Sequence, residues 1–254
     1  MPALKIALLQ DRPGSGIRPS YMEILEEESP DFLALPEYYS VSQDDDSVVT
    51  SSFRRNEIVA VLRELSIRLG SVLIGGSLVE RIDGSLYNRC YIFDSGEIAG
   101  HYNKIHPFDN EGRGLIREGH EYKVFDIRGM RIGILICADV LYPGSFGNIR
   151  GLRPDLIFIP TTSPYRPGEK KEQKYARDRR VFASGAAQAD CPIFKVCASG
   201  EVAGHRLQGR SLIAFPGRIV WRVEPEFEHK SALVIVRMPD LRNRDDLDIT
   251  VHRS

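Results

Sequence analysis

The chain has few cysteines, no long apolar run and almost no net charge. Its four cysteines include no C-x-x-C pair, so we expect free thiols in a reducing compartment instead of a disulfide framework. No apolar run approaches the roughly 18 residues of a membrane span, and the N-terminal stretch is too short and too polar on its far side for a signal peptide. The net charge of −1 gives no electrostatic reason to expect nucleic acid or an anionic membrane as partner. These features together predict a cytoplasmic protein.

What is present is an ordinary globular composition. The chain has 254 residues, of which 42% are hydrophobic and 27% charged, enough to bury a sizeable core. This length allows one large α/β domain or two small ones. Because no linker, low-complexity segment or clean repeat interrupts the chain, we predict a single domain over residues 1–254.

Apolar runs typical of buried strands alternate with amphipathic segments and hairpin turns. Predicted helices span residues 19–28, 56–69, 146–152 and 169–189. Predicted strands span residues 4–10, 31–37, 71–80, 86–93, 98–105, 124–127, 131–137, 155–160, 192–198, 211–215, 219–223 and 232–238, and a polar tail begins at residue 240. This alternation predicts a mixed sheet, or a pair of sheets, covered by helices.

Three side chains that could perform chemistry lie at the ends of predicted strands. Glu37 follows L-A-L-P, Lys104 lies in H-Y-N-K, and Cys137 ends G-I-L-I-C. Strand ends in α/β proteins border the crevice where ligands bind. A thiolate is a nucleophile whose pKa a nearby ammonium lowers, and a carboxylate can accept the thiol proton and later activate water. Each residue alone also has a structural interpretation, as a core thiol, a surface carboxylate or a lysine lying along the sheet.

The three segments resemble the three signature blocks of the nitrilase superfamily of carbon–nitrogen hydrolases. The blocks are L-P-E at 35–37, Y-N-K-I-H-P-F at 102–108 and G-I-L-I-C-A-D at 133–139. Their order matches the family, and so do their separations of 67 residues from glutamate to lysine and 33 from lysine to cysteine. The similarity continues through residues 151–160 and 209–217, and so covers nearly the whole chain.

The resemblance implies an α/β fold, a four-layer α-β-β-α sandwich of two mixed β-sheets. It also implies a catalytic triad of Glu37, Lys104 and Cys137, without a cofactor or a metal. The family often carries a second glutamate after the lysine block. Glu111 is the candidate for that role, and Glu118 is the alternative. The resemblance further implies a homodimer or a larger homo-oligomer.

The residues after the cysteine depart from the family pattern. Ala138 stands where an aromatic residue or asparagine is common, and Gly144 replaces the usual glutamate. Val140 and Leu141 stand where members that hydrolyse N-carbamoyl amino acids tend to carry arginine. We expect Ala138 and Tyr142 to contact the substrate, whose identity these departures leave open.

The function implied is hydrolysis of a small amide through a thioester on the cysteine, which releases ammonia or an amine and a carboxylic acid. A nitrilase or an N-carbamoyl (ureide) hydrolase with the same triad remains an alternative, and so does a non-catalytic binding protein on the same fold. The expected partner is a small-molecule amide or nitrile, with no nucleic acid and no membrane.

Two further groups of residues carry predictions. His106, two residues after the lysine of the second block, is expected to orient its loop by a hydrogen bond. Arg177, Arg179 and Arg180 cluster on the long predicted helix. Because acidic residues are interleaved with them, we predict a solvated mixed-charge face and not a phosphate site.

Overall fold

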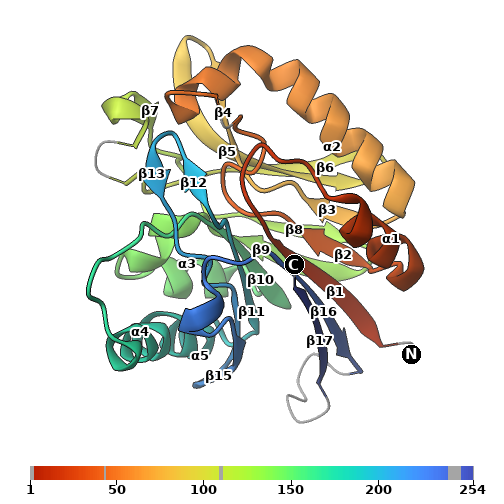
Figure 1. Cartoon of the computed structure of the whole chain (residues 1–254), viewed down its shortest axis with the longest axis vertical. Helices are drawn as coiled ribbons and strands as arrows, with labels where there is room; N and C mark the ends of the chain where they lie inside the picture. Colours follow the sequence, from red (N-terminus) through yellow and green to blue (C-terminus); the bar gives the residue numbers. More distant parts are fainter. Residues whose placement is uncertain (1–2, 43, 109–110, 240–246, 254) are drawn as a thin grey trace.

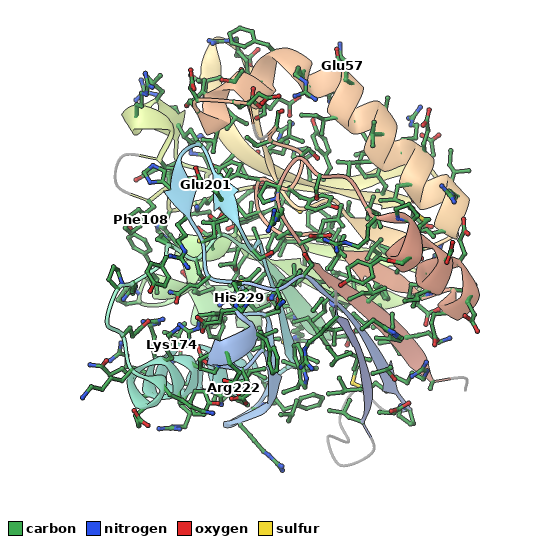
Figure 2. All side chains as sticks on the ribbon, in the orientation of Figure 1. Glu57, Phe108, Lys174, Glu201, Arg222 and His229 are labelled. Carbon is green, nitrogen blue, oxygen red and sulfur yellow. The ribbon has the colours of Figure 1, made fainter. Side chains whose placement is uncertain are left out.

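Two β-sheets pack face to face, with helices covering the outer face of each (Figure 1). The computed structural model describes residues 3–42, 44–108, 111–239 and 247–253. The molecule has four layers: an outer layer of helices, the two sheets, and a second outer layer of helices. Side chains fill the space between the layers (Figure 2). The predicted α-β-β-α sandwich of two mixed sheets is therefore confirmed.

The first sheet combines parallel and antiparallel neighbours. The central strands β1, β2 and β3 run parallel, whereas the strands on either side of them pair antiparallel. Its spatial order is β17 (Asp248–Arg253), β16 (Ala232–Met238), β1 (Leu4–Gln10), β2 (Phe32–Ala34), β3 (Val72–Ile74), β5 (Ser85–Asp94) and β4 (Leu78–Ile82), and β6 (Glu97–Asn103) and β7 (Ile116–Arg117) also pair with β5.

The second sheet is also mixed. Its three central strands, β9, β10 and β11, are parallel, and hairpins extend it on both sides. Its order is β15 (Arg218–Arg222), β14 (Leu212–Phe215), β11 (Ile193–Cys197), β10 (Leu156–Thr161), β9 (Met130–Ile134) and β8 (Val124–Ile127), and a separate short ribbon joins β12 (Glu201–Val202) to β13 (His205–Arg206).

Strand β1 shows why the buried strands read as continuous apolar runs. Successive side chains of a strand point to opposite faces. Ile6 and Leu8 face the second sheet, whereas Ala7 and Leu9 pack in the cluster beneath α1 (Pro19–Glu28). Both faces are buried, so no polar alternation appears.

Helices form the two outer layers. Helix α2 (Arg55–Leu69) buries Ile58, Leu62 and Leu69 against the first sheet and ends at Gly70 in the left-handed conformation. The second sheet is covered by α3 (Ser145–Gly151), α4 (Lys171–Asp178), the π-helical segment η4 (Arg179–Ala183) and α5 (Ser184–Ala189). Short 3-10 turns complete the chain: η1 (Val48–Arg54), η2 (Glu111–Gly114), η3 (Cys137–Leu141) and η5 (Pro225–Phe227).

Several predicted elements differ from the structure. The single strand predicted over 71–80 is two strands, because the chain turns at Gly75–Gly76. Gly76 has φ +69°, and a Cβ there would lie 2.2 Å from the Pro36 carbonyl oxygen. The glycine therefore lets the chain pass directly over the residue that precedes Glu37.

The long helix predicted over 169–189 is interrupted by the π-helical segment, which hydropathy periodicity does not reveal. The polar tail predicted from residue 240 is also wrong for its last part. Residues 240–246 lie outside the described residues, but β17 pairs with β16 along its length. Because β17 is an edge strand with an exposed side, its sequence lacks the apolar run of a central strand.

Candidate active site

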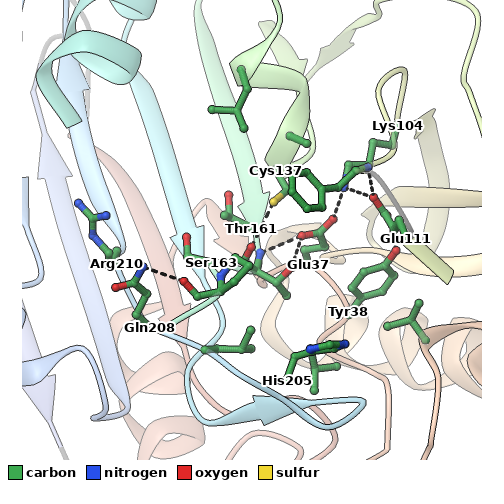
Figure 3. Close-up of a pocket in the computed structure, with 18 of the residues that line it drawn as sticks. Glu37, Tyr38, Lys104, Glu111, Cys137, Thr161, Ser163, His205, Gln208 and Arg210 are labelled. Atoms are coloured by element: carbon green, nitrogen blue, oxygen red, sulfur yellow. Dashed lines mark hydrogen bonds and ion pairs between the residues drawn. The ribbon is translucent and has the colours of Figure 1, made fainter. Parts of the chain in front are cut away.

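The ends of three strands bring Glu37, Lys104 and Cys137 to one cavity of about 580 Å³ (Figure 3). Glu37 follows β2 of the first sheet, and Lys104 follows β6 directly. Cys137 follows β9 of the second sheet. The site thus lies where the edges of the two sheets meet, and residues far apart in sequence become neighbours only through the packing of the sheets.

Lys104 is the buried electrostatic centre of the site. Its Nζ lies 2.8 Å from Glu37 Oε1 and 2.7 Å from Glu111 Oε2, and its side chain is 1% exposed. Burial alone would lower the pKa of Lys104, but the two carboxylates raise it above its ordinary value. The lysine therefore remains a cation between two anions.

Glu37 is held by donors from both sheets. Oε1 accepts from Lys104 and lies 3.0 Å from Asn88 Nδ2, on β5. Oε2 accepts from the backbone N–H of Thr162 at 2.8 Å and from the Thr162 hydroxyl. With both oxygens bonded, the carboxylate is fixed in orientation beside the thiol.

The structure brings Glu111 to the triad and leaves Glu118 exposed. Glu111 accepts hydrogen bonds from the Tyr38 hydroxyl and from the Phe108 N–H. Burial opposes its ionisation, but Lys104 and these donors keep the pKa of Glu111 below its ordinary value. Of the two glutamates left open by the sequence, only Glu111 contacts the lysine among the described residues.

Cys137 begins the 3-10 turn η3 and does not end the strand, which stops at Ile134. Its φ of +44° lies in the left-handed region, which is costly for a residue with a Cβ and recurs where a functional side chain must be presented. Its Sγ lies 3.2 Å from the carbonyl oxygen of Thr162. Cys137 lines the cavity and is half-buried.

The pKa of the Cys137 thiol is raised, although a neighbouring ammonium alone predicts a lowered pKa. Burial and the Glu37 carboxylate raise the pKa of Cys137 well above its ordinary value, and Lys104 opposes them only in part. The resting thiol is therefore neutral, and a base must remove its proton before or during attack. Glu37 carries the carboxyl group that lies beside it.

Asp139 fixes the turn that carries Cys137. One carboxylate oxygen accepts from the His106 N–H at 2.8 Å, and the other accepts from the Ile136 N–H and the Tyr102 hydroxyl, both at 2.9 Å. His106 thus orients its loop through its backbone. Burial raises the pKa of Asp139 from an ordinary 3.8 to about 6, although these donors oppose the shift.

This raised pKa predicts a specific pH dependence of stability. Between pH 3.8 and about 6 the folded state keeps a proton on Asp139 that the unfolded state releases. The contribution of this group to the free energy of unfolding therefore falls as pH rises through that window, by about 3 kcal/mol at most, and is constant above it. We expect Asp139→Asn to lack this decline. Urea unfolding of both proteins from pH 4 to 7 measures it, and parallel pH profiles would contradict the assignment.

The two predicted substrate contacts are placed differently. Ala138 lines the cavity, and its backbone N–H belongs to the first turn of η3, where N–H groups have no intrahelical acceptor. Tyr142 is absent from the cavity lining and stacks on His106, with ring centroids 3.8 Å apart. The aromatic ring braces the loop that carries Lys104, so we withdraw Tyr142 as a substrate contact.

The predicted solvated arginine face is wrong at one position. Arg179 and Arg180 are exposed, as expected. Arg177 lines the same cavity as Cys137, and its side chain, paired with Glu169, is only 18% exposed. The mixed charges of α4 therefore include a face turned toward the cavity.

The sequence interpretation missed three residues of the site: Tyr38, Asn88 and Thr162. Asn88 carried a usable signal, because asparagine is depleted inside strands and this one lies in the middle of β5. Tyr38 and Thr162 carried none, since each follows an unremarkable strand end.

Among the described residues, no group of three or more His, Cys, Asp or Glu side chains is arranged to hold a metal ion. None of the helices in the described part of the chain has the length and apolar character of a membrane-spanning segment.

The chain is similar in sequence to known carbon–nitrogen hydrolases. A family model described as carbon-nitrogen hydrolase matches residues 19–243, which confirms the resemblance seen in the three blocks. The chloroplastic omega-amidase of Arabidopsis thaliana is 33% identical over 193 residues, covering 70% of this chain and 49% of that protein. Omega-amidase NIT2-A of Xenopus laevis is 31% identical over 185 residues, covering 67% of this chain and 63% of that protein. The chain thus spans only about half to two thirds of the length of these relatives.

Solved structures show the same fold at low identity. An amidase from Nesterenkonia sp. superposes with a TM-score of 0.76 at 18% identity, over 96% of this chain and 93% of that one. The glutamine-dependent NAD+ synthetase of Acinetobacter baumannii superposes with a TM-score of 0.75 at 22% identity, over 99% of this chain and 48% of that one. The four-layer architecture is common to all three.

Proposed function

The chain belongs to the carbon–nitrogen hydrolase family, and on that premise we propose that it hydrolyses the C–N bond of a small amide through a thioester on Cys137. One observation carries this proposal. A thiol borders a cavity beside the Glu37 carboxyl group, both of whose oxygens are hydrogen-bonded and which a buried lysine holds in place. These are the parts that nucleophilic acyl transfer requires. The amidase neighbour and the omega-amidase relatives support an amide as substrate.

In the first half-reaction the Cys137 sulfur attacks the amide carbon, and Glu37 accepts the thiol proton. The carbonyl oxygen becomes an oxyanion, which the Lys104 ammonium and the Ala138 N–H stabilise. When this intermediate collapses, the C–N bond breaks and Glu37 returns the proton to the nitrogen. Ammonia or an amine leaves, and the acyl group remains on sulfur as a thioester.

In the second half-reaction water attacks the thioester carbon, and Glu37 accepts a proton from that water. The same two donors stabilise the second oxyanion. Its collapse breaks the C–S bond, Glu37 returns the proton to the sulfur, and the carboxylic acid leaves. Glu111 serves as a positioning residue, because its carboxylate lies 2.7 Å from Lys104 Nζ and anchors the lysine.

The test is turnover of a panel containing simple amides, nitriles and N-carbamoyl amino acids. We expect ammonia from the amides, together with an acyl adduct whose mass localises to the Cys137 peptide. Faster turnover of nitriles or of N-carbamoyl compounds would replace the amidase assignment by one of those activities. No turnover and no adduct across the panel would favour the non-catalytic binding protein.

We also propose that the protein is a cytoplasmic homodimer. The four free thiols support a reducing location, and the exposed Leu141 and Tyr142 lie beside α3, on the cysteine side of the molecule. Apolar side chains exposed together commonly mark an interface. Sedimentation velocity distinguishes a dimer from a monomer.

A further inference from the structure

The Glu37 carboxyl group is surrounded by four hydrogen-bond donors. Lys104 Nζ and Asn88 Nδ2 lie 2.8 Å and 3.0 Å from Oε1, and the backbone N and the hydroxyl oxygen of Thr162 lie 2.8 Å and 2.5 Å from Oε2. A carboxylate has about four lone-pair sites on its two oxygens. These donors fill all four sites, so one of them must turn away before either oxygen can take the proton of the Cys137 thiol.

Three of the four donors are fixed by other contacts. Lys104 is buried, and its Nζ is also held at 2.7 Å by Glu111. Asn88 is buried as well, and its Nδ2 also donates to Glu111 at 2.7 Å. The Thr162 N–H belongs to the backbone directly after β10, a strand that pairs with β9 and β11. None of these three donors can leave Glu37 without moving heavy atoms of the packed core.

The Thr162 hydroxyl differs from the other donors in two ways. Its hydrogen moves by rotation about the Cβ–Oγ1 bond alone, and the residue is half-buried at the cavity, so the hydrogen has space to turn into. A hydroxyl oxygen can also accept a hydrogen bond, whereas an ammonium, a side-chain NH₂ and a backbone N–H only donate. Among the described partners of Glu37, Thr162 therefore offers the group that can bond to the carboxyl both with and without a proton.

Thr162 contacts the nucleophile as well as the base. Its carbonyl oxygen lies 3.2 Å from Cys137 Sγ, while its N–H and hydroxyl bond to Glu37 Oε2. Figure 3 shows the thiol and the Glu37 carboxyl group bonded to this one segment of chain. Oε1 is held by Lys104 and Asn88, so Oε2 is the oxygen on the side of the thiol-bearing segment. We therefore assign the thiol proton to Oε2.

We propose that Thr162 is a positioning residue whose hydroxyl changes from donor to acceptor each time Glu37 takes up a proton. As sulfur attacks, the S–H bond breaks and the sulfur electron pair forms the C–S bond. The proton bonds to Oε2 at the site that the hydroxyl hydrogen leaves, and Oε2–H donates to Thr162 Oγ1 until the proton passes to the leaving nitrogen. The hydroxyl then turns back, and the attack of water repeats the cycle. This inference rests on the proposed amidase function and adds a residue to its proton transfer.

The experiment compares Thr162→Val, which removes the hydroxyl from a side chain of the same shape, with Thr162→Ser, which keeps it. Without the hydroxyl, the Glu37 O–H is a buried donor that lacks its acceptor. We therefore expect Thr162→Val to lower kcat about 10- to 100-fold on the best amide of the panel, with little change in KM. The acyl adduct on Cys137, followed by mass, should form and decay more slowly, because Glu37 takes up a proton in both half-reactions. Thr162→Ser should retain most of the turnover.

The matched control is Thr250→Val on β17, at the edge of the first sheet. It also removes a hydroxyl that bonds to another side chain, because Thr250 Oγ1 accepts from Arg237 at 3.1 Å. We expect turnover at the wild-type level. Circular dichroism verifies the fold of each variant, and Thr162→Ala carries the same expectation as Thr162→Val if the valine variant does not fold.

Wild-type kcat in Thr162→Val, or an equal loss in Thr162→Ser, would overturn the inference and leave the amidase proposal intact. So would a loss that appears only in KM or in one half-reaction. If the wild type hydrolyses no amide, the amidase proposal fails, and the role of Thr162 is judged by alkylation of Cys137 with iodoacetamide. This reaction also requires removal of the thiol proton, so Thr162→Val should slow it and Thr162→Ser should not. Equal alkylation rates in all three proteins would overturn the inference.

Discussion

Replacement of Cys137 by alanine is expected to lower amide turnover by about 10⁴-fold or more, to the level of the background reaction. Removing the nucleophile from a set of cooperating catalytic residues lowers turnover by about this factor or more, because the other residues cannot act without it. The fold should be preserved, since the cavity has room for the smaller side chain and alanine keeps the Cβ that this backbone already accommodates. Ammonia release under substrate saturation, together with the mass of the intact protein, measures the effect.

The matched control is Cys197→Ala, which removes a thiol that is buried and that pairs only weakly with the Ser163 hydroxyl, 3.6 Å away. Burial raises the pKa of Cys197 as it does that of Cys137, but Cys197 is fully buried, whereas Cys137 borders the cavity beside Glu37. Substantial turnover with Cys137→Ala, or an acyl adduct on another cysteine, would remove the proposed mechanism. Because the resting Cys137 is neutral, slow alkylation at neutral pH does not argue against its role, whereas a Glu37-dependent rate of acylation argues for it.

Replacement of Lys104 by methionine is expected to abolish turnover and to destabilise the fold together. The variant leaves the carboxylates of Glu37 and Glu111 buried without their common cation. Breaking a buried ion pair by removing one partner costs about 3–5 kcal/mol, which for a chain of this size corresponds to a Tm lower by about 10 °C. Thermal unfolding followed by circular dichroism measures the stability, and ammonia release measures the activity.

The double variant Lys104→Met with Glu111→Gln separates the two effects. Removing one of the two orphaned charges should recover part of the lost Tm, while turnover stays absent because the oxyanion has lost its cation. The deficit of the single variant should also shrink as pH falls toward 4, where the unpaired carboxylates take up protons. An unchanged Tm in the single variant would show that the two glutamates do not depend on Lys104 for their charge balance.

The sequence by itself determined the layers of the fold and the three residue types of the triad. Apolar runs such as Ile6–Leu9 specify buried strands because both faces of the sheet are covered, and the amphipathic face of α2 specifies a helix on the outside. Glu37, Lys104 and Cys137 were found because each lies next to a strand end within a recognisable block. These patterns depend on residues that are close in sequence, so the sequence alone reveals them.

The tertiary structure decided what depends on distance between segments. It places Glu111, and not Glu118, against Lys104, and it brings Asn88 and Thr162 into contact with the site. It also leaves Tyr142 outside the cavity lining, stacked on His106. These outcomes follow from how the two sheets and their loops pack. It also reversed the expected pKa shift of the thiol, since burial and a neighbouring carboxylate outweigh one ammonium.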